Sequence, residues 1–334
     1  MPCASRHPEP VPEHDRGRVL LTGATGYVGG RLLRKLEESG RPVRCMALRP
    51  EALLGRVADR TEVVRGDILE PCTLRAALAG VTTAYYLVHS MAASAHFAEA
   101  DRRGAESFAA AARDSAVRRI VYLGGLGSDE KLSTHLASRH EVGRILRESG
   151  VPTVEFRASI IIGSGSVSFE IVRGLVDRSP VLFMPRWVVS RTQPIAIEDV
   201  LEYLLAALDL EVDESPIFEI GGPDRVTYAD LMREYARQAS LRRALIRVPL
   251  ATPRVSALWL SVVTPLYASI GRELVESLRN DTLVCGQRAR EVFRSGHGDS
   301  VAQSSARLPT RTGSSPRPAG RTRSRLTEDR TGAA

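Results

Sequence analysis

A run of glycines between a short apolar segment and an amphipathic one constrains this chain more than any other feature of its sequence. Residues 18–22 (Arg-Val-Leu-Leu-Thr) have the composition of a buried strand, and residues 27–38 carry apolar side chains at helical spacing. Between them lie Gly23, Gly26 and Gly29 in the pattern Gly-x-x-Gly-x-x-Gly. Glycines so placed allow a tight turn, a close approach of phosphates to the backbone and close packing of helix on strand, and the helix N-terminus attracts the phosphates. The pattern therefore predicts a dinucleotide-binding turn.

Strand-like and helix-like segments alternate over the first 160 residues. We predict further strands at 43–48, 61–65, 83–88, 119–123 and 153–157, and helices at 71–79, 95–116 and 136–148. Alternation of this kind is typical of βαβ units, whose right-handed crossovers place helices on both faces of a parallel sheet. The predicted fold class is α/β, a Rossmann-type doubly wound parallel sheet with its ligand crevice at the carboxyl ends of the strands.

Composition divides the chain into four parts. Residues 1–16, rich in Pro, His and Glu, and residues 295–334, rich in Arg and Ser, lack the apolar side chains that a core needs, and we expect both to be disordered. Residues 17–160 form the predicted Rossmann domain. Residues 161–294 alternate less regularly, and we expect there a smaller α/β portion that contributes the substrate contacts. In that portion we predict helices at 169–177 and 198–208, a helix capped by Thr227 with Asp230, and strands at 193–197 and 216–220.

The end of the second predicted strand discriminates between two dinucleotides. An acidic residue there would bind the ribose 2′-hydroxyl of NAD, but this chain has Arg49, twenty residues after Gly29. An arginine can hold a 2′-phosphate by charge-assisted hydrogen bonds, so NADP(H) is favoured and NAD(H) is the alternative. The neighbouring Glu51 weakens this argument, and the competing interpretation of Arg49 is a solvated surface charge.

Asp67 follows the third predicted strand, and its carboxylate is expected either to accept from the adenine amino group or to cap the next helix. With the neighbouring Ile68, and with Val88 at the end of the fourth strand, it completes the set of cofactor contacts that we predict. That set is Gly23, Thr25, Gly26, Tyr27, Val28, Gly29, Arg49, Asp67, Ile68 and Val88.

The net charge of +7 does not by itself indicate a nucleic-acid partner. Residues 295–334 contain seven Arg against Asp299, Glu328 and Asp329, a net of +4, which leaves only +3 for the rest of the chain. We therefore expect a small-molecule substrate, whose identity the sequence does not give, and no nucleic acid.

Several features bear on where the chain works. The four cysteines form no Cys-x-x-Cys pair and no apolar signal segment precedes residue 17, so we expect a reducing compartment, the cytoplasm. The apolar residues 255–270 include Pro265 and are fewer than a transmembrane helix needs. We interpret them first as a buried helix pair and second as a peripheral membrane contact. No histidine spacing suits a metal site.

These motifs resemble those of the short-chain dehydrogenase/reductase superfamily, in its extended or atypical branch. The resemblance spans roughly residues 17–294 and is most specific to NmrA-like NAD(P)H-binding proteins, to the accessory NADH:ubiquinone oxidoreductase subunit of this fold, and to a related bacterial group. It implies an NAD(P)H cofactor and an oxidoreductase-type site. The residues that carry it are 22–30 (TGATGYVGG), 66–68 (GDI), 85–91 (YYLVHSM), 122–125 (YLGG), 193–195 (QPI) with Asp199 and Val200, and 218–223 (FEIGGP).

Members of this superfamily use a Tyr-x-x-x-Lys pair, in which the tyrosine exchanges a proton with the substrate and the lysine holds the ribose. No tyrosine of this chain has a lysine four residues later; the corresponding place reads His135-x-x-x-Arg139, and the usual serine position falls near Gly124 and Gly125, with Ser128 close by. In one interpretation His135 is a general acid/base and Arg139 binds the ribose. In the other the site is catalytically silent, because arginine does not replace lysine chemically. We interpret His89 as a residue that only lines the pocket.

Two hypotheses of function follow. The first is an NADP(H)-dependent oxidoreductase with a non-standard active site. The second is a cofactor-sensing or scaffold protein that binds its dinucleotide without turnover. The missing Tyr-Lys pair favours the second hypothesis, and the intact glycine turn suits both.

Overall fold

The computed structural model describes residues 17–89, 97–127, 132–184, 186–211, 213–247 and 280–294. The predictions for residues 1–16, 255–270 and 295–334 lie outside these ranges. Among the helices within them, none combines the length and the apolar character that a membrane crossing requires.

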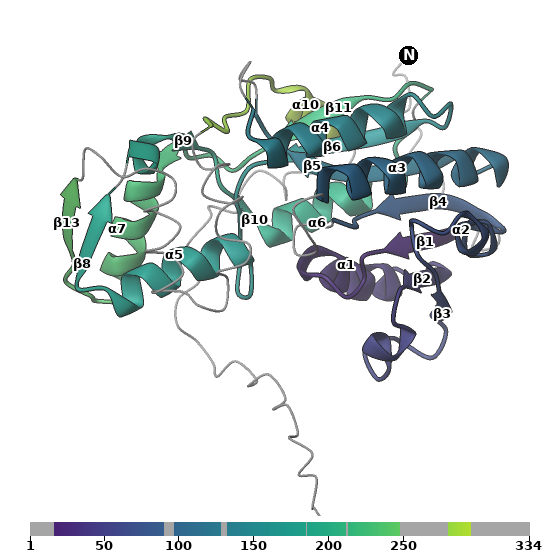
Figure 1. The fold of residues 1–334 in the computed structure, drawn as a ribbon, viewed down its shortest axis with the longest axis horizontal. Helices are drawn as coiled ribbons and strands as arrows, with labels where there is room; N and C mark the ends of the chain where they lie inside the picture. The colour runs from purple at the N-terminus through teal and green to yellow at the C-terminus, as the bar shows by residue number, and fades with distance from the viewer. Residues whose placement is uncertain are drawn as a thin grey trace, which may run out of the picture.

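Seven parallel strands form the central sheet, in the order β11-β6-β5-β4-β1-β2-β3 (Figure 1). The strand order reverses between β1 and β4, which places a crevice at their carboxyl ends. The predicted fold class, a Rossmann-type parallel sheet, is thereby confirmed. The strands are β1 (Arg18–Thr22), β2 (Val43–Ala47), β3 (Glu62–Arg65), β4 (Val81–Tyr86), β5 (Arg119–Gly125), β6 (Thr153–Ala158) and β11 (Ile217–Ile220).

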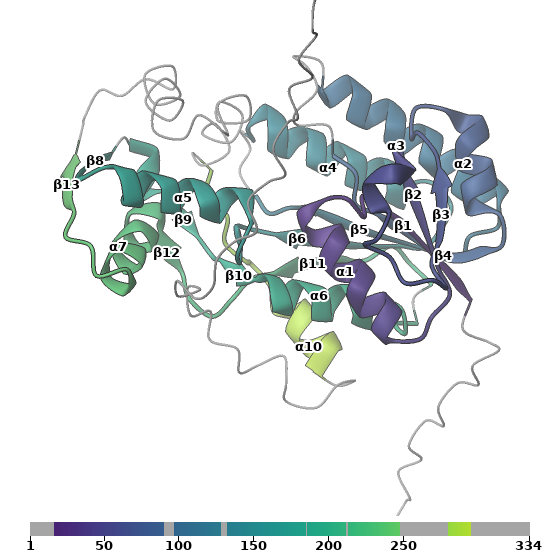
Figure 2. The same ribbon diagram turned by 90° about the horizontal axis from the view of Figure 1, so that it is seen from below.

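Helices cover both faces of this sheet (Figure 2). On one face lie α1 (Tyr27–Glu38), α6 (Ile197–Ala206) and α10 (Arg288–Arg294), and on the other lie α2 (Pro71–Leu78), α3 (Phe97–Asp114) and α4 (Thr134–Arg147). The buried stripe of α1 consists of Leu32, Leu33 and Leu36, each at most 2% exposed. Burial of a leucine contributes about 1.5–3 kcal/mol, so this stripe fixes α1 and the turn before it against the sheet.

The chain after residue 160 contributes both to this sheet and to a smaller lobe. Strand β11 pairs with β6, and Phe293 of α10 packs edge-on against Phe218 of β11. The prediction that a separate portion begins after residue 160 stays a prediction. The smaller lobe has its own apolar cluster. Its elements are α5 (Val167–Arg178), β8 (Val181–Met184), η3 (Arg186–Val189), β9 (Arg191–Thr192), β12 (Val226–Thr227), α7 (Tyr228–Gln238) and β13 (Ala244–Arg247). The short strands β7 (Ile161–Ile162) and β10 (Ile195–Ala196) pair with each other.

Two local predictions in this half had different outcomes. The capping box of α7 is confirmed, because Thr227 Oγ1 accepts the N–H of Asp230 (3.2 Å) and Asp230 Oδ2 accepts the N–H of Thr227 (3.0 Å). The predicted strand 193–197 is too long: only Ile195–Ala196 form a strand, β10, while residues 193–194 follow β9 and Ile197 begins α6. Pro194 has no N–H to donate to a ladder, and its carbonyl accepts the N–H of Gly222 (2.8 Å) instead.

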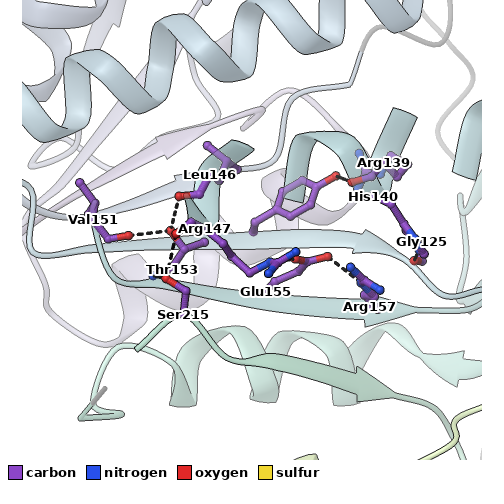
Figure 3. A network of polar contacts seen from close by, with 11 residues as sticks. Gly125, Arg139, His140, Leu146, Arg147, Val151, Thr153, Glu155, Arg157 and Ser215 are labelled. Carbon is purple, nitrogen blue, oxygen red and sulfur yellow. Dashed lines mark hydrogen bonds and ion pairs between the residues drawn. The ribbon is translucent and has the colours of Figure 1, made fainter. Parts of the chain in front are cut away.

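A buried carboxylate ties α4 to β6 (Figure 3). Glu155 is 0% exposed, and its two oxygens accept hydrogen bonds from Arg147 Nε (2.8 Å) and Arg157 Nε (2.7 Å). Gly143 leaves room for it, because a Cβ there would lie 2.5 Å from Glu155 Oε1. The buried negative charge of Glu155 is tolerated because both arginines form ion pairs with it.

Replacing Glu155 with Ala is expected to lower the free energy of unfolding by about 3–5 kcal/mol, because two partly buried guanidinium groups lose their partner. The matched control is Glu148→Ala, which removes the exposed partner of Arg144 and should cost less than about 1 kcal/mol. Urea unfolding followed by circular dichroism measures both. Equal losses in the two variants would contradict this role for the buried carboxylate.

Candidate cofactor and active site

A cleft of about 530 Å³ opens at the carboxyl end of the sheet, where the strand order reverses between β1 and β4. Residues that follow β1, β4, β5 and β6 line it, together with the first turns of α1 and α4. The cleft therefore brings the glycine turn and the His-x-x-x-Arg pair into one site. The predicted site residues that line it are Gly23, Gly26, Tyr27, Val28, Gly29, His135 and Arg139.

The three glycines of the turn have different structural roles. Gly23 has a φ of +74°, and a Cβ there would lie 2.6 Å from the carbonyl oxygen of Leu87. A Cβ on Gly29 would lie 2.2 Å from the carbonyl oxygen of Gly23, so Gly29 allows the helix to approach the strand. Gly26 has an ordinary extended conformation (φ −81°, ψ 176°), and a Cβ there would have its nearest neighbour 3.2 Å away. Its missing side chain therefore opens the cleft and also avoids a tight contact with the carbonyl oxygen of Gly23.

The N-terminus of α1 suits a bound phosphate. The first N–H groups of a helix have no intrahelical acceptor and carry a partial positive charge. No side chain caps this end, and its first turn contains no acidic residue. The hydroxyl of Tyr27 is also buried without a hydrogen-bond partner among the described residues. A glycine-lined cradle with a partial positive charge fits the pyrophosphate of a dinucleotide.

Three other predicted cofactor residues lie near the surface, outside the cleft lining. Thr25 is exposed in the turn, and Arg49 is exposed at the carboxyl end of β2, where it precedes η2 (Pro50–Leu53). Asp67 Oδ1 accepts the N–H of Leu69 (2.9 Å), so this carboxylate shapes its own turn. Their contacts with the cofactor stay predictions.

Ile68 and Val88 are the remaining predicted cofactor residues, and neither lines the cleft. Ile68 is 8% exposed and lies where α3 has Gly104, whose Cβ would be 2.6 Å from Ile68 Cδ1. Val88 follows β4, which ends at Tyr86 and not at residue 88 as predicted, and it packs partly against the core below α3. The cleft is instead lined by the residues on either side of Val88, Leu87 and His89.

His135 belongs to a chain of hydrogen bonds that ends on a buried carboxylate. Its Nε2 lies 3.0 Å from Nε2 of His89, and Nδ1 of His89 lies 2.9 Å from Oδ2 of Asp101. Ser138 Oγ donates to the same oxygen (3.3 Å), and Asp101 is only 3% exposed. The interpretation of His89 as a residue that only lines the pocket is therefore corrected, because it connects Asp101 to His135.

Burial makes both imidazoles harder to protonate. Desolvation, followed by the neighbouring His89 and the Arg139 guanidinium, lowers the pKa of His135 from 6.5 to about 3. Desolvation also lowers the pKa of His89, although the hydrogen bond to Asp101 opposes this shift. Both rings are therefore neutral near neutral pH, and each carries one N–H.

This pKa shift predicts a loss of stability in acid. Below about pH 6.5 the unfolded chain binds a proton at His135 that the folded chain takes up only near pH 3, so the free energy of unfolding falls by up to ~1.4 kcal/mol per pH unit over this range. In His135→Gln this contribution is absent. Urea unfolding of both proteins at a series of pH values should give a shallower acid slope for the variant, and identical slopes would contradict the assignment.

Arg139 is held against β5. Its guanidinium donates to the carbonyl oxygen of Leu123 and lies 5.1 Å from the ring centroid of Tyr122, whose hydroxyl donates to the Arg139 carbonyl (2.9 Å). On the same helix His140 donates to the carbonyl oxygen of Gly125 (3.0 Å; Figure 3). A role for Arg139 at the ribose stays a prediction.

There is little room for the usual serine at Gly124 and Gly125. A Cβ on Gly125 would lie 2.7 Å from Leu136 Cδ2 of α4, and one on Gly124 would lie 3.2 Å from the Tyr122 ring. A serine at Gly125 would have to displace the end of the Leu136 side chain, and one at Gly124 would crowd the Tyr122 ring. Ser128, the nearby hydroxyl residue in the sequence, lies outside the described residues.

A cluster of hydroxyl groups contributes to the far end of the lining. Ser159 Oγ lies 2.6 Å from the hydroxyls of Thr192 and Thr282, and Tyr228 hydrogen-bonds to Thr192. These residues come from four separate segments, so no sequence pattern indicates them. Most of the remaining wall is apolar and includes Leu87, Leu123, Leu126, Leu136, Ile160, Ile161 and Val167.

Metal ligands do not gather in the part of the chain that the structure describes. There, no three His, Cys, Asp or Glu side chains come close enough together to hold a metal ion.

Comparisons with known proteins agree with this geometry. Residues 23–159 match a family described as NAD(P)H-binding. The chain is 29% identical to (4-alkanoyl-5-oxo-2,5-dihydrofuran-3-yl)methyl phosphate reductase of Streptomyces griseus, over 66% of this chain and 73% of that protein. It is also 29% identical to ceramide reductase of Caulobacter vibrioides, over 70% of this chain and 74% of that protein.

The fold is shared with Citrobacter sp. triphenylmethane reductase, solved in complex with NADP(H). The TM-score is 0.66 at 15% identity, over 83% of this chain and 94% of that one. The family match begins at Gly23 and therefore covers the glycine turn, the strands from β2 to β6 and most of the residues that line the cleft. Residues 23–159 are therefore an NAD(P)H-binding domain of the Rossmann type, as the resemblance to the atypical short-chain dehydrogenases/reductases predicted.

Proposed function

We propose that this protein is an NADP(H)-dependent oxidoreductase that reduces a carbonyl group on an apolar substrate, with His135 as its general acid/base. One observation carries the proposal: His135 lines the same cleft as the glycine turn, at the start of α4. Bound NAD(P)H supplies a hydride to a carbonyl carbon. The carbonyl oxygen then needs a proton, and an imidazole in this position can deliver one.

The cleft wall supports an apolar substrate. Leu87, Leu126 and Ile160 belong to a lining that is mostly aliphatic, and such a surface favours alkyl or ring substituents. The names of the two relatives refer to a (4-alkanoyl-5-oxo-2,5-dihydrofuran-3-yl)methyl phosphate and to ceramide, which are both acyl compounds. The hydroxyls of Ser159 and Thr282 offer donors for a second oxygen of the substrate.

A substrate panel tests this proposal. The purified protein is incubated with NADPH and a series of ketones and quinones whose alkyl substituents lengthen stepwise, and NADPH consumption is followed by absorbance. We expect turnover that rises with the length of the apolar group. Bound NADPH that no member of the panel oxidises would refute the proposal.

Cofactor choice gives a separate prediction. If Arg49 holds the 2′-phosphate, NADPH should bind at least about tenfold more tightly than NADH, because a charge-assisted pair is worth ~1.5–3 kcal/mol. Arg49→Glu should remove this preference, since it replaces the cation with a carboxylate that repels the phosphate. Fluorescence titration with both nucleotides measures the ratio, and an unchanged ratio in the variant would place the 2′-phosphate elsewhere.

A cofactor-sensing protein without turnover is the second candidate. The missing Tyr-x-x-x-Lys pair and the low pKa of His135 favour it, because a neutral imidazole has to be protonated before it can act as an acid. Under this candidate NADPH binds and changes the conformation of the protein, but no hydride is transferred. Substitutions of His135 then have no turnover to reduce.

A further inference from the structure

A buried carboxylate on α3 connects this helix to α4 and to the segment that follows β4. Asp101 lies on the apolar face of the helix, with Phe97 one turn before it and Phe108 two turns after it, all at most 5% exposed. Burying a carboxylate is costly unless hydrogen bonds compensate. Two of its partners are Nδ1 of His89, which lines the cleft, and Oγ of Ser138 on α4.

We propose that the carboxylate of Asp101, acting through His89, determines which ring nitrogen of His135 carries the proton. This inference rests on the proposed function for its catalytic consequence, although its structural part can be tested without a substrate. In it Asp101 and His89 are positioning residues, and His135 is the residue that exchanges the proton.

The direction of each hydrogen bond follows from the carboxylate. An ionised carboxylate can only accept, so Nδ1 of His89 donates to it, and a neutral His89 then has a bare Nε2. That nitrogen accepts the N–H on Nε2 of His135, 3.0 Å away. Neutral His135 therefore carries its lone pair on Nδ1.

Proton transfer then takes place at Nδ1 of His135. In the reducing direction, protonated Nδ1 gives its proton to the oxygen that receives the carbonyl π electron pair, and the nitrogen keeps the N–H bonding pair. Nδ1 is afterwards protonated again from solvent. The negative charge of Asp101 stabilises the protonated ring through His89, whereas Arg139 on α4 opposes it; these are the charged groups that face the two rings among the described residues.

Asp101→Asn separates positioning from packing, because it keeps the shape of the side chain. Its amide is no longer restricted to accepting: when its N–H₂ donates to Nδ1 of His89, the His89 proton moves to Nε2 and the His135 proton to Nδ1. The matched control is Glu106→Gln, the same change at an exposed position of α3. We expect both variants to bind NADPH within about threefold of the unaltered protein.

Nitrogen-15 NMR of the histidine rings reads the tautomers directly, with signals assigned through His89→Gln and His135→Gln. We expect neutral His135 to be protonated on Nε2 in the unaltered protein and in Glu106→Gln, and to show a population protonated on Nδ1 in Asp101→Asn. Turnover should fall about 10²–10⁴-fold in Asp101→Asn, as expected for a wrong tautomer, and the rise of the reduction rate toward lower pH should flatten. The same tautomer of His135 in all three proteins would overturn the proposal, as would unchanged turnover in Asp101→Asn. If no substrate is ever reduced, the proposed function fails while the NMR result still decides the tautomer.

Discussion

Gly26→Val is expected to weaken NADPH binding at least about a hundredfold, a loss of ~2.7 kcal/mol. Gly26 lines the cleft at the N-cap of α1, where phosphates would meet the backbone, and its extended conformation accepts a β-branched residue. Valine there would place two methyl groups in the path of the pyrophosphate. Its Cβ would lie 3.2 Å from the carbonyl oxygen of Gly23, so the turn would have to shift by a few tenths of an ångström to accept it. Fluorescence titration with NADPH gives the affinity.

The control for this variant is Gly286→Val, the same substitution at a glycine where an added Cβ would have no atom within 4 Å. It should bind NADPH like the unaltered protein. Circular dichroism and thermal unfolding of both variants check the fold. Full affinity in a folded Gly26→Val protein would mean that the phosphates do not rest on this turn.

His135→Ala is expected to reduce the turnover number about 10²–10⁴-fold, the range that a positioned general acid contributes. The Michaelis constant and the NADPH affinity should change little, because the ring hydrogen-bonds to His89 and, in the proposed reaction, exchanges a proton with the substrate instead of holding the cofactor. Initial rates over a range of substrate concentrations separate the two constants.

Thr134→Ala is the control for this second variant, since Thr134 is exposed one residue earlier in the same turn of α4. It should keep the turnover of the unaltered protein. Loss of NADPH affinity equal to the loss of turnover in His135→Ala would indicate that His135 supports binding instead of proton transfer.

The N-terminal half of the fold was predictable because strand composition, turn residues and helical spacing there all indicate the same elements. The first strand and helix, Arg18–Thr22 and Tyr27–Glu38, have the predicted bounds, since an apolar strand, a glycine turn and a leucine stripe each indicate them independently. Beyond residue 160 the rules conflict. Residues 193–197 have the composition of a strand, but Pro194 interrupts the ladder and distant segments decide the pairing.

The candidate site was predictable only in part. The glycine turn and His135 follow from motifs, whereas the hydroxyl cluster depends on contacts between segments far apart in sequence. Asp101 did leave a signal: a carboxylate on the same helical stripe as Phe97, Ala105 and Phe108 is buried if the helix is. Such a residue needs a partner, and the sequence does not say that the partner is His89.

Titration of the purified protein with NADPH and NADH tests the central claim most directly. We predict saturable binding of a nicotinamide dinucleotide, with NADPH the tighter ligand, at concentrations well below millimolar. If neither nucleotide changes the protein's fluorescence or its own at millimolar concentration, the cleft at the carboxyl end of β1 is not a dinucleotide site, and the function proposed for it is wrong.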